Sequence, residues 1–197
     1  SKFRYPLSES RIKRSKEKYG IKGQYIVYVG TLKPSKNVEG LLQAFSKLIG
    51  FDLTLVIIGK KGWLYESIFK IVQDLQIENK VVFTDFVEEE EKVDLLAGAK
   101  CLVSPSFTEG FGMHVLEAMA TGCPVVVSKI GSLPEVVGEA GILVDPDDTE
   151  SIAKGINFVV SLPQGKYNQL RGAAITQAEK FSWEKTAKKT LEILEKL

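Results

Sequence analysis

A group of glycines and carboxylates follows the apolar run at residues 101–103. Gly110 and Gly112 stand just before a helical pattern that starts near residue 113. Glycines at such a position leave the free N–H groups of the first helical turn open to an anion, and a diphosphate fits that geometry. We therefore predict a diphosphate cradle at this point. Its contacts would come from the first-turn amides of Gly112, Met113, His114, Val115 and Leu116.

Glu109 lies before this helical pattern and Glu117 lies within it. A carboxylate beside a diphosphate is repelled, so each glutamate is better suited to accept hydrogen bonds from hydroxyl groups on either side of the phosphates. Sugars and ribose offer such hydroxyls. The alternative is that both are acids of a helix start, where the helix dipole favours negative charge. The constellation as a whole favours the ligand-binding interpretation.

A second candidate loop, residues 30–37, follows the first apolar run of the chain. Gly30 permits a close approach of the backbone to a ligand. Asn37 or Ser35 would cap the next helix, and Lys36 would place a positive charge beside the helix end that attracts anions. The spacing matches neither a Walker loop nor G-x-G-x-x-G. Taken alone, this loop favours a solvated lysine over a phosphate site.

The elements that must position these loops alternate along the chain. Short runs rich in Val and Ile are typical of strands covered on both faces, and longer segments with one apolar face predict helices. This alternation predicts an α/β fold with one doubly wound parallel sheet of about six strands, whose ligands bind beyond the carboxyl ends of the strands. The expected strands cover residues 25–29, 53–58, 81–83, 101–103, 125–127 and 142–144. The expected helices cover residues 8–19, 38–48, 65–75, 89–97, 113–121, 151–160, 164–180 and 183–197.

Composition excludes several classes of protein. Of the 197 residues, 44% are hydrophobic and 26% are charged, and the net charge is +1. This is the composition of an ordinary globular protein, and such a charge gives no reason to expect nucleic acid as a partner. No apolar run reaches the roughly 20 residues needed to cross a bilayer, and a cytoplasmic location is expected. Cys101 and Cys123 lack C-x-x-C spacing, which predicts two buried reduced thiols.

The segment at residues 104–124, which contains S-F-T-E-G-F-G-M-H-V-L-E-A-M-A-T-G-C-P, resembles the E-x7-E signature of glycosyltransferase family 4, the group 1 glycosyltransferases. Residues 29–37 are similar to the family's phosphate loop, residues 82–87 to its base-binding edge, and residues 131–137 to its G-G-x-P-E-V-V turn. The resemblance runs from about residue 8 to the end. It implies a GT-B enzyme with two Rossmann-like domains, of which this chain would be the carboxyl-terminal, donor-binding half.

The resemblance also implies a role for each candidate residue. Glu109 would contact hydroxyls of the donor sugar, Glu117 would contact the ribose diol, and Lys36 would neutralise a phosphate as charge grows on the leaving group. Glu109 and Lys36 are therefore the candidate catalytic residues. The other nucleotide-sugar contacts would be Gly30 and Thr31 at the phosphates, Phe86 and Val87 at the base, and Gly110 and Phe111 beside the sugar and diphosphate. Transfer is expected with retention, from a UDP- or GDP-linked sugar, and without a metal or another cofactor.

Two positions depart from the family pattern. Thr31 stands where many members carry Arg, so a second cation on the phosphates is missing. Asp85 stands in place of the usual Gly, so the base-binding edge is expected to be reshaped.

Three other features have simpler explanations than ligand chemistry. His114, the only histidine, fits a packing or helix-surface role better than a phosphate donor. Residues 145–147 form the D-x-D pattern of metal-dependent glycosyltransferases, but they lie between a strand and a helix that starts near Thr149, where turn and cap chemistry explains them. Residues 11–18 form a basic helix, for which a solvated face is favoured over an acidic membrane surface.

Residues 1–197 are thus predicted to form one nucleotide-sugar-binding domain, with a core at 8–181 and a crossover-type helix at 183–197. The amino-terminal acceptor domain would be absent, and the isolated half would be inactive. The exposed stripe of the last helix would then favour a dimer. Two alternatives stay open, a nucleotide-sugar epimerase of the GT-B type and a non-catalytic sugar-nucleotide-binding module. The sequence leaves the sugar, the base and the acceptor undetermined.

Overall fold

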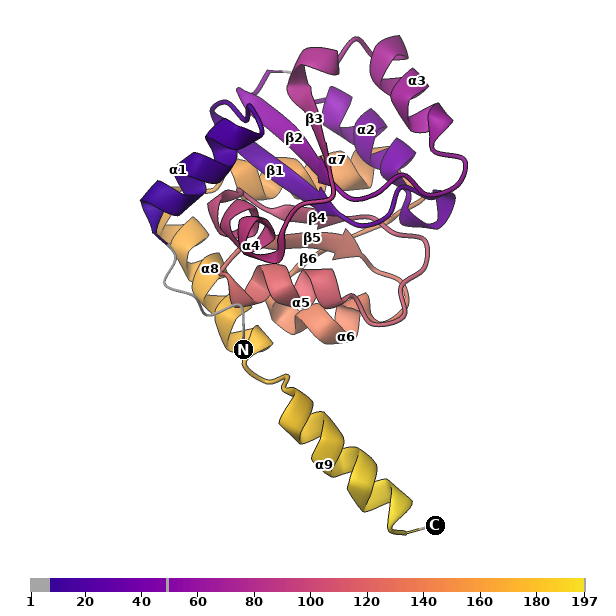
Figure 1. The fold of residues 1–197 in the computed structure, drawn as a ribbon, viewed down its shortest axis with the longest axis vertical. Helices are drawn as coiled ribbons and strands as arrows, with labels where there is room; N and C mark the ends of the chain where they lie inside the picture. The colour runs from indigo at the N-terminus through magenta and orange to yellow at the C-terminus, as the bar shows by residue number, and fades with distance from the viewer. Residues whose placement is uncertain (1–7, 49, 197) are drawn as a thin grey trace.

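The computed structural model describes residues 8–48 and 50–196, and within this part of the chain six strands form one parallel sheet (Figure 1). The strand order is β3-β2-β1-β4-β5-β6. This is the order of a doubly wound sheet, and it confirms the predicted α/β fold. The strands are β1 (Gln24–Val29), β2 (Leu53–Ile58), β3 (Val81–Asp85), β4 (Leu102–Ser104), β5 (Val125–Ser128) and β6 (Ile142–Val144).

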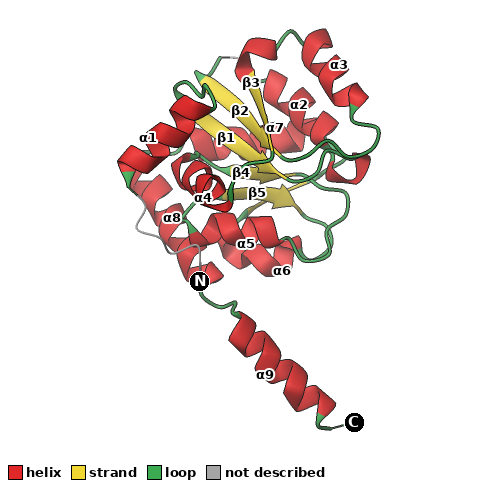
Figure 2. Cartoon of the chain, viewed as in Figure 1, coloured by secondary structure: helices red, strands yellow, loops and turns green. Residues whose placement is uncertain are grey.

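Helices cover both faces of the sheet (Figure 2). One face carries α2 (Val38–Ser46), α3 (Glu66–Asp74) and α7 (Thr149–Val160). The other carries α4 (Glu89–Gly98), α5 (Met113–Ala120), α6 (Leu133–Val137) and α8 (Gln164–Ala178). Along β1, Ile26 and Tyr28 face the first layer while Tyr25 and Val27 face the second. Because successive strand side chains alternate between faces, a sheet covered on both sides needs the continuous apolar runs of this sequence.

Short elements and caps complete the layers. Three 3₁₀ turns, η1 (Pro34–Lys36), η2 (Glu78–Lys80) and η3 (Gly138–Ala140), join longer elements within the described residues. Ser8 caps the first helix, because its Oγ accepts the N–H of Arg11 at 3.3 Å. The short helix α6 was expected only as a turn. Its Pro134 lies in the first helical turn, where a missing N–H costs no helical hydrogen bond.

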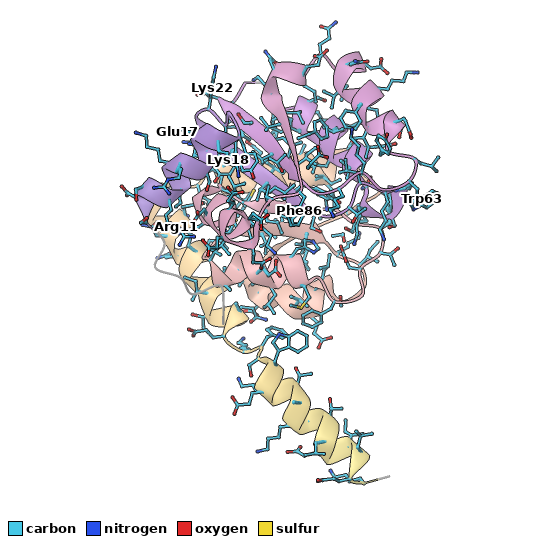
Figure 3. All side chains as sticks on the ribbon, viewed as in Figure 1. Arg11, Glu17, Lys18, Lys22, Trp63 and Phe86 are labelled. Carbon is cyan, nitrogen blue, oxygen red and sulfur yellow. The ribbon has the colours of Figure 1, made fainter. Side chains whose placement is uncertain are left out.

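The basic helix α1 (Glu9–Lys18) packs against the acidic start of α4. Arg11 lies 3.2 Å from Asp94, and the Ser15 hydroxyl donates to the same carboxylate at 3.3 Å. Lys18 pairs with Glu91, and Figure 3 labels Arg11 and Lys18 on this helix. The face of α1 that was expected to be solvated is therefore partly an interhelical ion-pair surface.

Both cysteines are buried and reduced, as predicted. Burial raises the pKa of the Cys101 thiol well above its usual range, and it raises the pKa of Cys123 to about 12. Neither side chain therefore carries thiolate character near neutral pH, which agrees with a packing role.

The last helix, α9 (Trp183–Leu194), extends away from the body of the molecule (Figure 1). None of its described residues is buried, and Trp183 is 77% exposed. This confirms the predicted exposure of its apolar side chains; Leu197, which the expected helix included, lies outside the described residues. Among the helices of residues 8–48 and 50–196, none is long and apolar enough to cross a membrane.

Candidate functional site

The loops after β1 and β4 meet at the carboxyl edge of the sheet. These strands are neighbours, but β2 and β3 lie on one side of them and β5 and β6 on the other. In open α/β sheets, ligands bind where the strand order reverses in this way. The N–H of Phe107 donates to the carbonyl of Ser35 at 3.0 Å, so the two loops are in direct contact. The two loops that the sequence singled out therefore form one site.

Asn37 joins three loops at this edge. Its Oδ1 accepts the N–H of Gly40 and so caps α2, as predicted, while Ser35 contributes only its carbonyl. Its Nδ2 donates to the carbonyls of Pro105 at 3.1 Å and Pro146 at 2.7 Å. Asn37 is 7% exposed, and its φ of 53° is left-handed, a conformation that Asn tolerates better than most residues. It thereby fixes the loops after β1, β4 and β6 against one another.

Lys36 and Glu109 form an ion pair at the centre of the site. Lys36 Nζ lies 2.5 Å from Glu109 Oε1, and the two side chains are 17% and 9% exposed. The hydroxyl of Ser106 donates to the same carboxylate oxygen at 3.0 Å. Ser128 in turn donates to the carbonyl of Ser106 at 2.7 Å. The alternative of a solvated loop lysine is therefore wrong, because Lys36 is drawn inward by this carboxylate.

Helix α5 begins at a glycine that cannot cap it with a side chain. Gly112 has φ 89°, and its carbonyl accepts the N–H groups of Val115 at 2.9 Å and Leu116 at 3.2 Å. The amides of Gly112, Met113 and His114 precede Val115, the first residue whose N–H is bonded within the helix. Such N–H groups have no acceptor in the helix and point out of its start. The amides of Val115 and Leu116, which the sequence assigned to the predicted anion cradle, are instead used by the helix itself.

The side chains of the cradle differ in exposure. Phe111 and Met113 are exposed, and the Phe111 ring meets Phe181 edge-on with centroids 5.9 Å apart. Val115 is fully buried, and half-buried Leu116 packs against the same core cluster. Gly110 is exposed and open, because a Cβ built there would meet nothing within 4 Å.

His114 lies close to the ion pair. Its Nε2 is 2.8 Å from the hydroxyl oxygen of Ser104 and 3.8 Å from Glu109 Oε1. Burial lowers the pKa of His114 to about 4; the charge of Glu109 opposes this, and those of Lys36 and Lys92 add to it. The imidazole is therefore neutral at pH 7, which agrees better with the predicted packing role than with a charged phosphate donor.

Glu117 has a lysine partner of its own. Lys92 Nζ, from α4, lies 2.9 Å from Glu117 Oε2, and the side chains are 16% and 15% exposed. Lys92 also lies 3.2 Å from Glu89, whose side chain is largely exposed. Burial lowers the pKa of Lys92, but its hydrogen bonds and charge interactions with Glu117 and Glu89 outweigh this and raise it overall. Both glutamates of the E-x7-E segment are thus ion-paired.

The candidate phosphate loop, residues 29–37, starts where β1 ends. The N–H of Gly30 donates to the carbonyl of Ile58 at 2.9 Å, and the hydroxyl of Tyr28 donates to the carbonyl of Thr31 at 3.3 Å. Thr31 itself is exposed. A Cβ on Gly59 would lie 2.0 Å from the Gly30 carbonyl, so the ends of β1 and β2 approach each other more closely than a side chain would allow.

The predicted base-binding edge divides into an open and a closed position. Phe86 is 60% exposed beyond the end of β3, and Lys60 Nζ lies 5.2 Å from its ring centroid (Figure 3). Val87 is buried against the core under α4. Asp85 has φ 54°, so it takes the left-handed conformation that glycine adopts most easily. The substitution therefore keeps the local turn, and Phe86 is the side chain available to a flat ligand.

The D-x-D triplet has the turn chemistry that was predicted. Asp145 accepts the N–H of Asp147 at 3.1 Å and pairs with Lys129 at 2.8 Å. Asp148 caps α7 by accepting the N–H of Glu150 at 2.8 Å. No group of three or more potential metal ligands occurs among the described residues.

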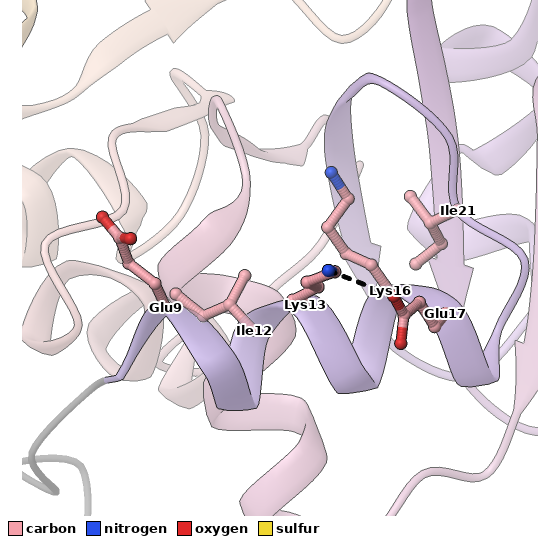
Figure 4. A pocket seen from close by; sticks show the side chains of 6 residues that line it. All are labelled: Glu9, Ile12, Lys13, Lys16, Glu17 and Ile21. Carbon is pink, nitrogen blue, oxygen red and sulfur yellow. Dashed lines mark ion pairs between the residues drawn. The ribbon is translucent and has the colours of Figure 1, made fainter.

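One hollow lies away from this site, and a second lies at its margin, where Asn37 lines it. The larger, of about 360 Å³, borders α1 near Ile21, just before β1 and so at the amino edge of the sheet (Figure 4). Lys13 and Glu17 form a 3.8 Å ion pair on its wall. A smaller hollow of about 130 Å³ lies beside the phosphate loop, between Lys33 and Phe107. Neither of these two hollows is lined by Lys36, Glu109 or Glu117.

Residues 10–181 match the family described as "Glycosyl transferases group 1". The chain belongs to the group 1 glycosyltransferases. It is 38% identical over 180 residues to the O-antigen chain mannosyltransferase B of Escherichia coli. This matched region covers 89% of this chain and 47% of that relative. It is 33% identical over 177 residues to a D-inositol 3-phosphate glycosyltransferase of Rhodococcus jostii, covering 85% of this chain and 39% of the relative. The chain thus spans less than half the length of these two relatives.

Solved structures share the fold of this group 1 glycosyltransferase. A glycosyltransferase from Rickettsia africae superposes with a TM-score of 0.89 at 22% identity, over 97% of this chain and 52% of that one. The Anabaena protein HepE, solved in complex with UDP and glucose, superposes with a TM-score of 0.87 at 24% identity. The match covers 96% of this chain and 53% of HepE. These similarities confirm the Rossmann-like fold.

One polar residue of this site was missed from the sequence: Lys92, which holds Glu117, was not singled out. Ser106, which holds Glu109, opens the quoted E-x7-E segment but was given no role of its own. Lys92 follows a run of four glutamates, residues 88–91, at the start of α4. Leu95 and Leu96, which lie at positions i+3 and i+4 from Lys92 in the same helix, are fully buried. That helical spacing places Lys92 on the inward face and was the available signal.

Proposed function

We propose that this chain is the nucleotide-sugar-binding part of a retaining hexosyltransferase, which transfers a hexosyl unit from a nucleoside-diphosphate sugar to a glycan, lipid or small-molecule acceptor. The observation that carries the proposal is the Lys36–Glu109 pair beside the three free amides at the start of α5. A cation and a helix start together suit a diphosphate, and a neighbouring carboxylate suits sugar hydroxyls.

Each group then has a defined task. The diphosphate lies on the amides of residues 112–114, and Lys36 turns from the carboxylate to a phosphate oxygen. Glu109 accepts hydrogen bonds from sugar hydroxyls, Glu117 accepts them from the ribose diol, and Phe86 offers a ring face to the base. As the bond from the anomeric carbon to the phosphate oxygen breaks, negative charge grows on the leaving diphosphate. Lys36 and the helix start stabilise that charge where it develops.

The acceptor hydroxyl attacks the same face of the sugar that the diphosphate leaves, and its proton passes to the departing phosphate oxygen, so the configuration is retained. A second Rossmann-like domain would supply the acceptor pocket, and the residues of this chain by themselves would bind donor without transferring sugar. Since the chain spans less than half the length of its mannosyltransferase relative, a second domain of comparable size fits that proportion.

A mannosyl donor is the first candidate, because a relative of 38% identity is named a mannosyltransferase. A uridine nucleotide is the other candidate, because HepE was solved with UDP and glucose. Isothermal titration of the chain with UDP, GDP, UDP-glucose and GDP-mannose tests the proposal. We expect one nucleotide series to bind, and its sugar-linked form to bind more tightly. Failure of both UDP and GDP to bind at millimolar concentrations would overturn it.

The exposed stripe on α9 favours self-association of the isolated chain. Trp183, Leu191 and Leu194 are all exposed and repeat at helical spacing, so a second copy would bury them. Sedimentation at several concentrations should show a dimer, and Leu191→Lys combined with Leu194→Lys should abolish it. Lys188→Ala is the matched control on the same helix. A strict monomer for the unaltered chain contradicts this expectation.

A further inference from the structure

The two glutamates of the site have similar partners. Glu109 pairs with Lys36 from the loop after β1, and Glu117 pairs with Lys92 from the helix after β3. In both pairs less than a fifth of each side chain is exposed. Lys36 has a role in the proposed function as the phosphate cation, whereas Lys92 has none. A lysine held this far from solvent against a ligand-binding carboxylate requires its own explanation.

We propose that Lys92 is a positioning residue for nucleotide recognition: it holds the Glu117 carboxylate in the orientation that accepts the ribose diol. The inference rests on the proposed function, because it presupposes that Glu117 binds ribose. Lys92 contacts neither base nor phosphate in this proposal. It acts through Glu117 alone.

The geometry of the pair supports this role. Lys92 engages Oε2 of Glu117 at 2.9 Å. An ionised carboxylate has two oxygens with about four lone-pair sites, so one ammonium leaves enough acceptor capacity for two hydroxyl donors. A glutamate side chain has three rotatable bonds, and a fixed partner reduces the conformational entropy that is lost when a diol binds.

The position of Lys92 in the chain also supports it. Lys92 lies on the first turns of α4, shortly after Phe86, which is the candidate base contact. Val87 is buried and anchors the start of this segment against the core. Helix α4 packs on α5, which carries Glu117. The Lys92–Glu117 pair thus sets the distance between the base edge and the ribose carboxylate.

The experiment compares ribose with deoxyribose on the folded chain. Binding of UDP, 2′-deoxy-UDP, GDP and 2′-deoxy-GDP is measured for the unaltered chain and for four variants, Glu117→Gln, Lys92→Met, Lys92→Arg and Glu89→Gln. For the unaltered chain we expect the ribonucleotide to be preferred by about tenfold, since a site built for a hydroxyl discriminates against its loss. Glu117→Gln should reduce that preference to near unity.

Lys92→Met should reduce the preference to about threefold or less, because the untethered carboxylate loses its orientation while the deoxynucleotide is hardly affected. Lys92→Arg should restore most of the preference by keeping a cation on Glu117. Glu89→Gln is the matched control, because it removes an exposed carboxylate that also pairs with Lys92, and it should leave the preference unchanged.

The outcomes separate this inference from the proposed function. If the unaltered chain binds neither nucleotide, the proposed function fails. Glu117→Gln abolishing the preference while Lys92→Met weakens the binding of ribonucleotide and deoxyribonucleotide equally would mean that Lys92 acts only as a positive charge near the nucleotide. That result overturns the inference. If Lys92→Met does not fold by circular dichroism, Lys92→Gln takes its place with the same expectation. An unchanged preference in the folded neutral variant refutes the inference.

Discussion

Lys36 Nζ lies 2.5 Å from Glu109 Oε1, although the two residues belong to loops that follow different strands. Each member of this pair has a competing partner in the proposed reaction, a phosphate oxygen for the lysine and sugar hydroxyls for the glutamate. Phosphate binding by Lys36 and sugar binding by Glu109 are therefore coupled. A ligand that offers only phosphates must break the Lys36–Glu109 ion pair, and Glu109 then has no sugar hydroxyl to replace the lysine.

This coupling predicts that Glu109→Gln tightens the binding of free nucleoside diphosphate by about threefold to tenfold, where tenfold corresponds to about 1.4 kcal/mol. The neutral amide releases Lys36 and removes a repulsive charge. The same variant should lose the extra affinity that an attached sugar confers. Calorimetric titration of nucleotide and nucleotide sugar measures both effects, with exposed Glu135→Gln as control. Weaker binding of the free nucleotide would show that the pair does not compete with phosphate.

Asn37→Ala should lower the free energy of unfolding by about 3 kcal/mol, because it removes a helix cap and leaves two carbonyls without their donor. The donor bonds go to Pro105 and Pro146, so three loops lose their common anchor. Urea denaturation measures the change, and Asn79→Ala, at an exposed position, is the control. A loss similar to that of the control would mean that the loops are held by other contacts.

Much of the fold was predictable because its signals are local. A sheet covered on both faces needs continuous apolar strands, and the six predicted runs differ from the observed strands by at most two residues at either end. Helix α6 was missed because its five residues follow Gly131 and Ser132 and contain Pro134, which together are typical of a turn. The ion pairs between α1 and α4 depend on how the helices pack, which no local pattern encodes.

The site was predictable in its residues but not in its pairings. The spacing of Glu109 and Glu117 indicated both glutamates, yet their lysine partners come from other loops and helices. Val87 was expected at the base, but the side chain is buried because it starts the segment that packs α4 on the core. Contacts of this kind require the strand order β2-β1-β4, which brings residues 36 and 109 together.

His114 should make the free energy of unfolding depend on pH. Its pKa is about 4 in the folded chain and near 6.5 when unfolded, so the unfolded state binds the extra proton first as pH falls. The contribution of His114 to the free energy of unfolding is therefore complete above pH 6.5. It decreases by about 2 to 3 kcal/mol as the pH falls from 6.5 toward 4. Glu109 opposes the shift, while Lys36 and Lys92 add to it.

His114→Gln should remove this component of the pH dependence. The difference in urea midpoints between the two proteins at several pH values measures the imidazole together with its charge interaction with Glu109. The chain has a single histidine, so one imidazole resonance in NMR spectra reports it directly. A resonance that titrates near pH 6.5 in the folded protein would contradict the buried, neutral state.

The two glycines that flank Phe111 should respond differently to the same substitution. Gly112 has φ 89°, and a Cβ there would lie 2.5 Å from Cδ2 of Leu133, so Gly112→Ala should cost about 2 to 4 kcal/mol of stability. Part of the clash is relieved if the leucine rotates, but the left-handed strain remains. Gly110 has open space around its Cα, so Gly110→Ala should change stability by less than about 0.5 kcal/mol.

Nucleotide-sugar binding separates the roles of these glycines further. A methyl group on Gly110 projects into the space proposed for the sugar and diphosphate, so Gly110→Ala should weaken donor binding in a protein that folds normally. Thermal unfolding and donor titration on the same samples give both values. If Gly110→Ala binds donor as well as the unaltered chain, the ligand does not approach this loop, and the cradle is limited to the amides that follow it.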